Sequence, residues 1–246
     1  MTTALTLTPG RWVLTGILAV GLPLAGCSSS RSNPPVARHT LVAITPAVAS
    51  AAAAAINLTA ADVPGFTSSP PSPKTTKDRL ASTALAACYG GVDPATNVAD
   101  LHSDDFSRGG GLALQRIATS VSFVRTLAEA HQDLAAASGP SASGCLRNYL
   151  DQAVTAGAGT TITLVSSAIS ALPTKAPGTD GAFGYRLTVH ATSSGLSFAF
   201  YLDLLACLKG RTEVSLMTLG INSPFPPADR DRLWQAVVSR AASKAV

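Results

Sequence analysis

Two long alternating segments joined by a short turn constrain the fold of this chain most strongly. Residues 183–192 and 196–205 are rich in aromatic and β-branched side chains, and Thr192-Ser193-Ser194-Gly195 connects them. Such a pattern around a glycine-containing connection predicts an antiparallel β-hairpin. A pairing of Thr192 with Gly195 sorts the hairpin into a face with Tyr185, Leu187, Val189, Phe198, Phe200 and Leu202, and a face with Arg186, Thr188, His190, Ser197, Ala199 and Tyr201. A one-residue slip would mix the two faces, so the register is strongly implied.

The other segments predict one α+β domain around this hairpin. Further strands are expected at residues 114–124, 160–172 and 212–219, and helices at residues 75–89, 126–138, 143–157 and 227–242. Consecutive strands in the second half are joined by short turns, whereas a parallel sheet would need a crossover helix between strands. We therefore predict an antiparallel sheet of about five or six strands covered by helices, in a single domain.

Capping signals and apolar spacing locate the helices and their buried faces. Thr75 with Asp78 and Thr126 with Glu129 have the spacing of capping boxes at helix starts. The predicted inward-facing residues are Leu80, Ala84, Ala87 and Cys88 in the first helix, Leu127, Ala130, His131 and Leu134 in the second, Cys145, Leu146, Tyr149, Leu150 and Ala153 in the third, and Leu233, Trp234, Val237, Val238 and Ala241 in the last.

The N-terminal segment predicts where the protein works. Leu24-Ala25-Gly26-Cys27 follows an apolar run over residues 12–24 and has the form of a bacterial lipobox, although Arg11 is the only basic residue before it. We therefore predict a signal peptide over residues 1–26 and a diacylated Cys27 at the start of the mature chain, on the extracytoplasmic face of the membrane. The apolar run is too short to span a bilayer, and two acyl chains would give stable attachment. The alternative is a core segment whose cysteine is buried by chance.

The domain boundaries follow from this signal. Residues 27–55 begin with a polar stretch, pass Pro34-Pro35 and end in the run Ala51–Ala55. We interpret them as the lipidated N-terminus and a flexible tether, with nascent helix in the alanine run as an alternative. Residues 56–246 then form the globular domain.

Three cysteines remain once Cys27 is assigned to the lipid. Disulfides persist outside the cytoplasm, so an odd number predicts one bridge and one free thiol. Cys88 and Cys145 lie toward the ends of predicted helices, and we pair them. Cys207 ends an apolar strand and is predicted to be a small buried side chain.

Charge and motifs argue against several classes of function. Residues 1–26 contain one arginine and no acidic residue, so the mature chain has a formal charge of +3. Its basic residues are scattered along the sequence, and no nucleic-acid partner is therefore expected. The histidines lack metal-ligand spacing, and His102-Ser103-Asp104-Asp105 lacks the pattern of a calcium loop, so we predict a solvated turn there and no metal or cofactor. No G-x-S-x-G motif is present, and a non-catalytic protein is expected.

The hairpin also supplies a candidate pocket. Arg186, His190 and Tyr201 share its less apolar face and could line a polar pocket, and the alternative is a half-solvated sheet face. The apolar face under the helices could instead open into a cavity for a hydrophobic ligand, which the sequence cannot distinguish from a filled core.

Several short motifs together resemble a known group of proteins. They are the lipobox at Cys27, Asp62-Val63-Pro64-Gly65, Cys88-Tyr89-Gly90, Ser103-Asp104-Asp105-Phe106, Cys145-Leu146 and Gly210-Arg211. The pattern resembles actinobacterial cell-envelope lipoproteins of the PsbP-like group, and is similar in layout to extracytoplasmic sensor domains of mycobacterial serine/threonine kinases. The resemblance implies a sheet packed between helices, a Cys88–Cys145 bridge, and a binding or assembly role. It carries over no ligand-site residue.

The leading functional hypothesis is therefore a membrane-anchored extracytoplasmic binding or sensor-type module. Its partner would be a hydrophobic small ligand or another envelope component. The alternatives are a structural or adaptor lipoprotein that binds a protein partner, and an envelope hydrolase. A cavity with convergent polar groups would favour the first hypothesis, and a large exposed apolar patch would favour the adaptor. A Ser or Cys within hydrogen-bond reach of His190 or His131 in a cleft would favour the hydrolase.

Overall fold

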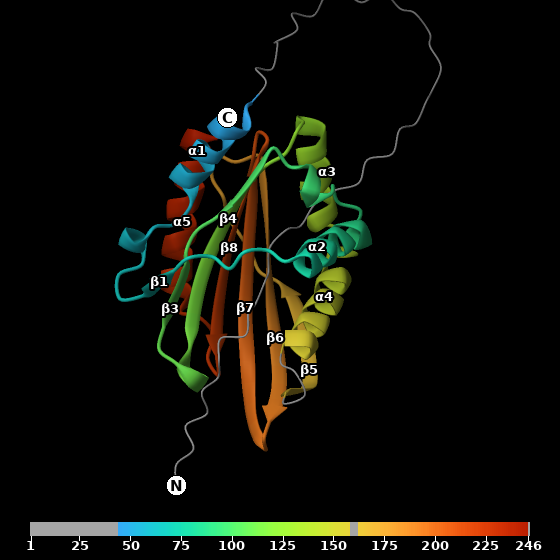
Figure 1. Ribbon diagram of the computed structural model, residues 1–246, viewed down its shortest axis with the longest axis vertical. Coiled ribbons are helices and arrows are strands. Elements are labelled where there is room, and N and C mark those ends of the chain that lie inside the picture. Colours follow the sequence, from blue (N-terminus) through green and yellow to red (C-terminus); the bar gives the residue numbers. More distant parts are fainter. Residues whose placement is uncertain (1–43, 158–161, 246) are drawn as a thin grey trace, which may run out of the picture.

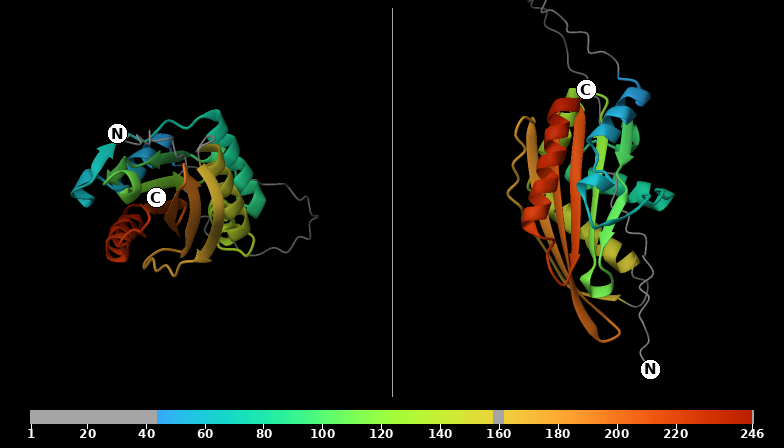
Figure 2. Two further views of the ribbon diagram at one scale, coloured as in Figure 1. Left: turned by 90° about the horizontal axis from the view of Figure 1, so that it is seen from below. Right: turned by 90° about the vertical axis from the view of Figure 1, so that its left-hand side faces the viewer.

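An eight-stranded antiparallel sheet with helices packed on it organises this chain (Figures 1 and 2). The structure is a computed structural model and describes residues 44–157 and 162–245. The predicted signal peptide, Cys27 and the first part of the predicted tether lie outside the described residues. The α+β class and the antiparallel sheet predicted from the sequence are confirmed. The number of strands is higher than the five or six predicted.

The strands follow the order β1-β3-β4-β8-β7-β6-β5, and β2 pairs with β4 beside this path. Their bounds are β1 Thr67–Ser69, β2 Ala99–His102, β3 Asp105–Arg108, β4 Gln115–Phe123, β5 Ile162–Ala171, β6 Gly181–Ser193, β7 Leu196–Lys209 and β8 Thr212–Ile221. The helices are α1 Pro46–Ile56, α2 Thr76–Tyr89, α3 Leu127–Ala137, α4 Ala142–Gly157 and α5 Pro227–Lys244. The strands that sequence analysis missed, β1 to β3, have three or four residues each, too few to show an alternation.

The central hairpin forms with its two faces as predicted but with a different turn. Ser193 pairs with Leu196, so the two turn residues are Ser194 and Gly195 rather than Ser193 and Ser194. Both have positive φ, at 50° and 79°, which a two-residue hairpin turn of the favoured hand requires and which glycine accepts without strain. The predicted pairing of Thr192 with Gly195 is therefore wrong. Each cross-strand partner moves by two residues, and a shift of two leaves every side chain on its predicted face.

The two faces of the sheet have separate cores. On the first, which we call the α5 face, odd-numbered residues of β4 and even-numbered residues of β8 pack against α1 and α5. On the second, the α2–α4 face, odd-numbered residues of β6 and even-numbered residues of β7 pack against α2, α3 and α4. The inward stripe predicted for α5 is buried on the α5 face as expected.

Helix α1 corrects the predicted tether. The tether was predicted to extend to residue 55, but Pro46–Ile56 is a helix capped by the Thr45 hydroxyl, and its Ala49, Ala53 and Ile56 are fully buried against β2, β4 and α5. Spacing of i, i+4 and i+7 puts these three on one side, and alanine lets the helix lie close to its neighbours. The packed part of the chain therefore begins near residue 45.

Helix α2 buries a different face from the one predicted. It begins at the Thr75–Asp78 capping box and ends at Gly90, whose φ is 84°. Leu80 is 67% exposed, and Ala84, Ala87 and Cys88 are also exposed, whereas Ser82, Leu85, Ala86 and Tyr89 are buried. In α3, similarly, Ala130 is buried as predicted while His131 is exposed, and the buried stripe runs through Asp133 and Ala137. In both helices the buried stripe therefore lies next to the predicted stripe and has the same helical period.

A disulfide joins α2 to α4. Cys88 at the end of α2 is bonded to Cys145 near the start of α4, with Cα atoms 5.8 Å apart. The pairing predicted from the sequence is confirmed. Cys207 is a free cysteine buried in β7, also as predicted, and its burial raises the pKa of its thiol to about 12.

Among the helices that the structure describes, none has the length and apolar character needed to cross a bilayer.

Candidate functional site

A cavity of about 130 Å³ lies between the α2–α4 face of the sheet and the three helices that cover it. Leucine, phenylalanine, methionine and alanine side chains make up most of its wall. Its polar lining includes three carboxyl groups, three serines and one tyrosine: Asp100, Asp133, Glu213, Ser120, Ser122, Ser215 and Tyr149. An apolar hollow with a few convergent polar groups is the usual form of a small-molecule site.

Strand pairing places the polar side chains in two adjacent rows. Asp100 of β2 pairs with Ser122 of β4, and Ser122 pairs with Glu213 of β8, so these three side chains form one row across the sheet. The neighbouring row includes Ser120 and Ser215, whose hydroxyl oxygens are 2.8 Å apart. The cavity therefore has a polar end built by side chains from three strands.

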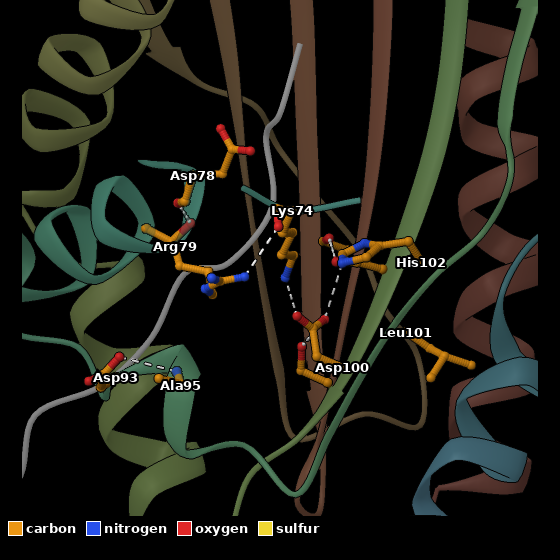
Figure 3. Close-up of polar contacts among 12 residues, drawn as sticks. Lys74, Asp78, Arg79, Asp93, Ala95, Asp100, Leu101 and His102 are labelled. Atoms are coloured by element: carbon orange, nitrogen blue, oxygen red, sulfur yellow. Dashed lines mark hydrogen bonds and ion pairs between the residues drawn. The ribbon is translucent and has the colours of Figure 1, made fainter. Parts of the chain in front are cut away.

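Asp100 is the carboxylate of this end that lies beside basic side chains. Lys74 donates to its Oδ2, His102 Nε2 lies 3.5 Å from its Oδ1, and Ser122 donates to the same Oδ1 at 3.1 Å. Figure 3 shows Lys74 and His102 approaching the carboxylate from two sides. Burial acts to raise the pKa of Asp100, but His102 and Lys74 outweigh it and hold that pKa well below its usual range.

Lys74 reaches Asp100 from the segment between β1 and α2, residues 70–75, which we call the strap. The strap crosses over the sheet on its way to α2 (Figure 1). It contains three prolines, which stiffen an exposed segment that has no regular structure. The Lys74–Asp100 ion pair thus joins the strap to the polar end of the cavity.

Asp133 and Glu213 form a carboxyl pair in which no cation takes part. Asp133 comes from α3, is 1% exposed, and accepts a hydrogen bond from the backbone N–H of Val92. Burial raises the pKa of Asp133 to about 8, against the hydrogen bonds from Val92 and Glu213. Burial also raises the pKa of Glu213 well above its ordinary value, and the negative charge of Asp133 adds to this effect. Two carboxyl groups this close favour sharing a proton over ionising together.

Three buried polar atoms at this pair have no hydrogen-bond partner among the described residues. They are Asp133 Oδ2, Glu213 Oε1 and the Tyr89 hydroxyl of α2. Burial raises the pKa of Tyr89, and the charges of Asp133 and Glu213 raise it further, so the three groups are electrostatic neighbours. An unpaired buried polar atom costs about 1–3 kcal/mol, so Asp133 and Glu213 at the cavity wall favour either a proton shared between them or a polar group that enters beside them.

The residues predicted to line a pocket lie on the other face of the sheet. Arg186, His190 and Tyr201 all project from the α5 face, and none lines the cavity. Arg186 donates twice to Asp203 at 2.6 Å, and Arg230 of α5 donates to the same carboxylate at 2.7 Å. His190 is exposed. None of these three residues therefore contributes to this cavity, and Arg186 is part of an ion-pair cluster that joins the sheet to α5.

His102-Ser103-Asp104-Asp105, predicted to be a solvated turn, runs from the last residue of β2 to the first residue of β3. Ser103 is buried and its hydroxyl accepts from the Thr119 backbone N–H at 2.9 Å, so the segment is tied to β4. In the described part of the chain, no three His, Cys, Asp or Glu side chains come together in a way that would hold a metal ion.

Sequence analysis did not identify Asp133 or Glu213. Eighty residues separate them, and each occupies a position that looks solvent-facing in a local pattern. One signal was available, since Asp133 lies three residues after Ala130 and four before Ala137, both buried. An ionisable residue on an apolar helical stripe indicates a buried polar site.

Comparison of the sequence with known protein families and with characterised proteins finds no match. The arguments about function therefore depend on the cavity and on the N-terminal sequence pattern.

Proposed function

We propose that this protein is a non-catalytic binding module whose cavity under α2, α3 and α4 holds a small, largely apolar ligand, and that the module is anchored by a lipid on the extracytoplasmic face of a membrane. The observation that carries the proposal is the cavity itself, with apolar walls and unpaired buried oxygens at one end. A filled core would be close-packed, and it would leave neither a cavity nor unpaired buried oxygens.

The alternatives receive less support. An adaptor would need a broad apolar patch, but the exposed large apolar side chains Val48, Leu80, Leu112, Leu127, Val165 and Leu196 belong to six different elements. A hydrolase that uses a Ser or Cys activated by His131 or His190 would need that histidine in a cleft, and both are exposed side chains outside the cavity. The six exposed apolar side chains are scattered rather than joined in one patch, which is ordinary on a protein surface.

The lipid anchor is proposed from the sequence alone. Cys27 follows a lipobox, and the Cys88–Cys145 disulfide fits a chain that is exported to an oxidising compartment. The resemblance to envelope lipoproteins and kinase sensor domains agrees with this class of role. In an actinobacterial host fed an alkyne-labelled fatty acid, the full chain should take up label and pellet with membranes. Cys27→Ala should do neither, and a labelled Cys27→Ala chain would refute the anchor.

Native mass spectrometry tests the cavity. A chain that lacks residues 1–27, purified from the same host, should carry a bound small molecule that Ala206→Phe excludes. Ala206 lines the cavity from β7, so a phenyl ring there fills the space. The control is Ala54→Phe on the exposed side of α1, which should retain the bound mass. If the purified wild-type chain is empty, and if adding small aromatic compounds changes neither its mass nor its melting temperature, the proposed binding function is wrong.

A further inference from the structure

We propose that the end of the domain from which the chain leads back to Cys27 is a membrane-contact surface, and that its basic side chains bind the headgroups of anionic phospholipids. This inference rests on the proposed function, because it assumes that a lipid on Cys27 holds the domain at a membrane. It adds the orientation of the domain on that membrane and the class of lipid that the surface binds.

Segments that are far apart in the sequence meet at this end, which we call the tether end. The first turn of α1, the β7–β8 turn and the last turn of α5 lie together at one extremity of the molecule (Figures 1 and 2). The described chain begins there, at residue 44. The residues between Cys27 and this point can span at most about 60 Å whatever their conformation, so an anchor on Cys27 keeps the tether end nearest to the lipid.

Hydrogen bonds join the β7–β8 turn to the start of α3. The backbone N–H of Val124 donates to the Arg211 carbonyl oxygen at 3.0 Å, and Arg211 Nη1 donates to the Arg125 carbonyl oxygen at 3.0 Å. Lys209 is the last residue of β7, two residues before Arg211. Three basic residues from two separate segments are therefore neighbours at the tether end.

The segment before β6 connects this turn to the last turn of α5. Asp180 accepts a backbone hydrogen bond from the β7–β8 turn at 2.6 Å and lies 3.4 Å from Lys209 Nζ. Two residues earlier, Gly178 lies against Ala242 of α5, since a methyl group on Gly178 would come within 3.3 Å of the Ala242 Cβ. Lys244 follows two residues later at the end of α5 and is exposed, so it adds a fourth basic side chain.

Positive charge exceeds negative charge at the tether end. Its two acidic residues are already paired, Glu129 with Arg125 at 2.8 Å and Asp180 with Lys209. The Arg125 side chain is nevertheless 54% exposed, and that of Lys209 is 37% exposed. Among the described residues, neither Arg211 nor Lys244 forms an ion pair with an acid. The surface therefore keeps a net positive charge after its own ion pairs have formed.

The segment that leads to Cys27 has the same sign of charge. Residues 28–43 contain Arg31 and Arg38 and no acidic residue. At the opposite end of α5, by contrast, the side chains of Asp229 and Asp231 are 45% and 61% exposed. Lysine and arginine side chains close to a membrane are attracted by anionic headgroups, and a basic patch reinforces a lipid anchor. The charge thus favours an anionic membrane at the tether end.

Two of the exposed apolar side chains also lie at the tether end. Val48 is 51% exposed in the first turn of α1, and Leu127 is 38% exposed at the first residue of α3, two residues after Arg125. Apolar side chains among basic ones suit the boundary between lipid headgroups and acyl chains. This combination fits a lipid surface better than it fits a soluble polyanion.

Attachment to lipid nanodiscs tests this surface. A ¹⁵N-labelled chain that begins at Cys27 is coupled there to a maleimide lipid, because Cys88 and Cys145 are bonded to each other and Cys207 is buried. The discs contain a trace of nitroxide-labelled lipid, which broadens the amide signals of residues that approach the membrane. They are made of phosphatidylcholine alone, or of seven parts phosphatidylcholine to three parts phosphatidylglycerol.

With phosphatidylglycerol, the amides of residues 125–127 and 209–211 should be broadened at least threefold more than those of Ser194 and Gly195 in the β6–β7 turn. With phosphatidylcholine alone, this ratio should fall by at least half. High salt should reduce the ratio in the anionic discs in the same way, because it screens exposed charges. A ratio near one in the anionic discs, or the same ratio in both kinds of disc, would refute the inference.

Two pairs of substitutions that change the net charge equally provide the matched comparison. Arg125→Gln/Lys244→Gln removes two positive charges from the tether end and should lower the ratio in anionic discs by at least half. Lys77→Gln/Arg147→Gln removes two from exposed positions on α2 and α4 and should keep it. Equal ratios in the two variants would show that the total charge of the protein, and not this surface, attracts the lipid. If the first variant does not fold, the salt and lipid comparisons on the wild-type chain still decide.

These outcomes are separate from those of the proposed function. The maleimide lipid replaces the acyl chains, so the broadening ratios do not depend on whether Cys27 is acylated in the cell. A Cys27 that takes up no fatty acid would contradict the proposed anchor, whereas a ratio that ignores lipid charge would contradict only the contact surface.

Discussion

The Asp133–Glu213 pair predicts that this protein loses stability as the pH rises from 5 to 8. Both carboxyl groups have raised pKa values in the folded chain, and burial is the main cause. In the unfolded chain they titrate near 4. Between these values the folded chain binds more protons than the unfolded chain, so each rise in pH favours unfolding. This direction is opposite to that of Asp62, Asp100 and Asp180, whose lowered pKa values stabilise the fold above pH 4.

The magnitude follows from the pKa of Asp133, about 8 in the folded chain against a reference value of 3.8. A proton held by the folded state alone changes the unfolding free energy by about 1.4 kcal/mol per pH unit, or at most about 4 kcal/mol over three units. We expect about 2 kcal/mol, because water that enters the cavity solvates the ionised pair and reduces the penalty.

Urea unfolding at pH 5, 6, 7 and 8 and constant ionic strength measures this effect. The comparison is with Asp133→Asn/Glu213→Gln, which has no titrating group at the pair but keeps an oxygen to accept from Val92. The wild-type chain should lose about 2 kcal/mol more than the double variant over this range. Asp229→Asn should follow the wild-type chain. Equal losses in wild type and double variant would show that the pair holds no extra proton, and the electrostatic reasoning about the cavity would be wrong.

Two further predictions concern the fold. Replacing both Cys88 and Cys145 with alanine removes a bridge across 57 residues, and it should lower the unfolding free energy by up to about 4 kcal/mol in urea melts. A loss below about 1 kcal/mol would contradict the chain-entropy estimate. Ala53→Leu adds bulk at a fully buried contact of α1 and should cost about 1–3 kcal/mol, whereas Ala54→Leu on the exposed side should change stability by less than about 0.5 kcal/mol. Equal effects of these two would indicate that α1 is not docked on the sheet.

The sequence predicted those parts of the fold that depend on neighbours close along the chain. The hairpin of β6 and β7 has the predicted faces because alternation assigns side chains to sides whatever the turn does. The helix starts at Thr75 and Thr126 form the expected capping boxes because both partners lie within three residues. The buried stripe of α5 was also found, since its large apolar residues leave one choice of face.

Other features depended on contacts that no local pattern records. Helix α2 offers two apolar stripes of equal period, and packing against α4 decides that Leu85 rather than Leu80 is buried. Helix α1 consists mostly of alanine, so its hydrophobic pattern is weak until β2, β4 and α5 surround it. Strands β1 to β3 are too short to show a period and exist because a longer neighbour supplies their hydrogen bonds.

By itself, then, the sequence determined the α+β class, the faces of the central hairpin and the helix starts, since periodicity and capping act locally. The number of cysteines predicted one bridge, and the places of Cys88 and Cys145 toward helix ends led to the right pairing. Only the tertiary structure decided which face of α2 is buried and where the cavity lies. It alone brings Asp133 of α3 beside Glu213 of β8, because burial and the proximity of two charges are properties of the packed chain and not of either segment.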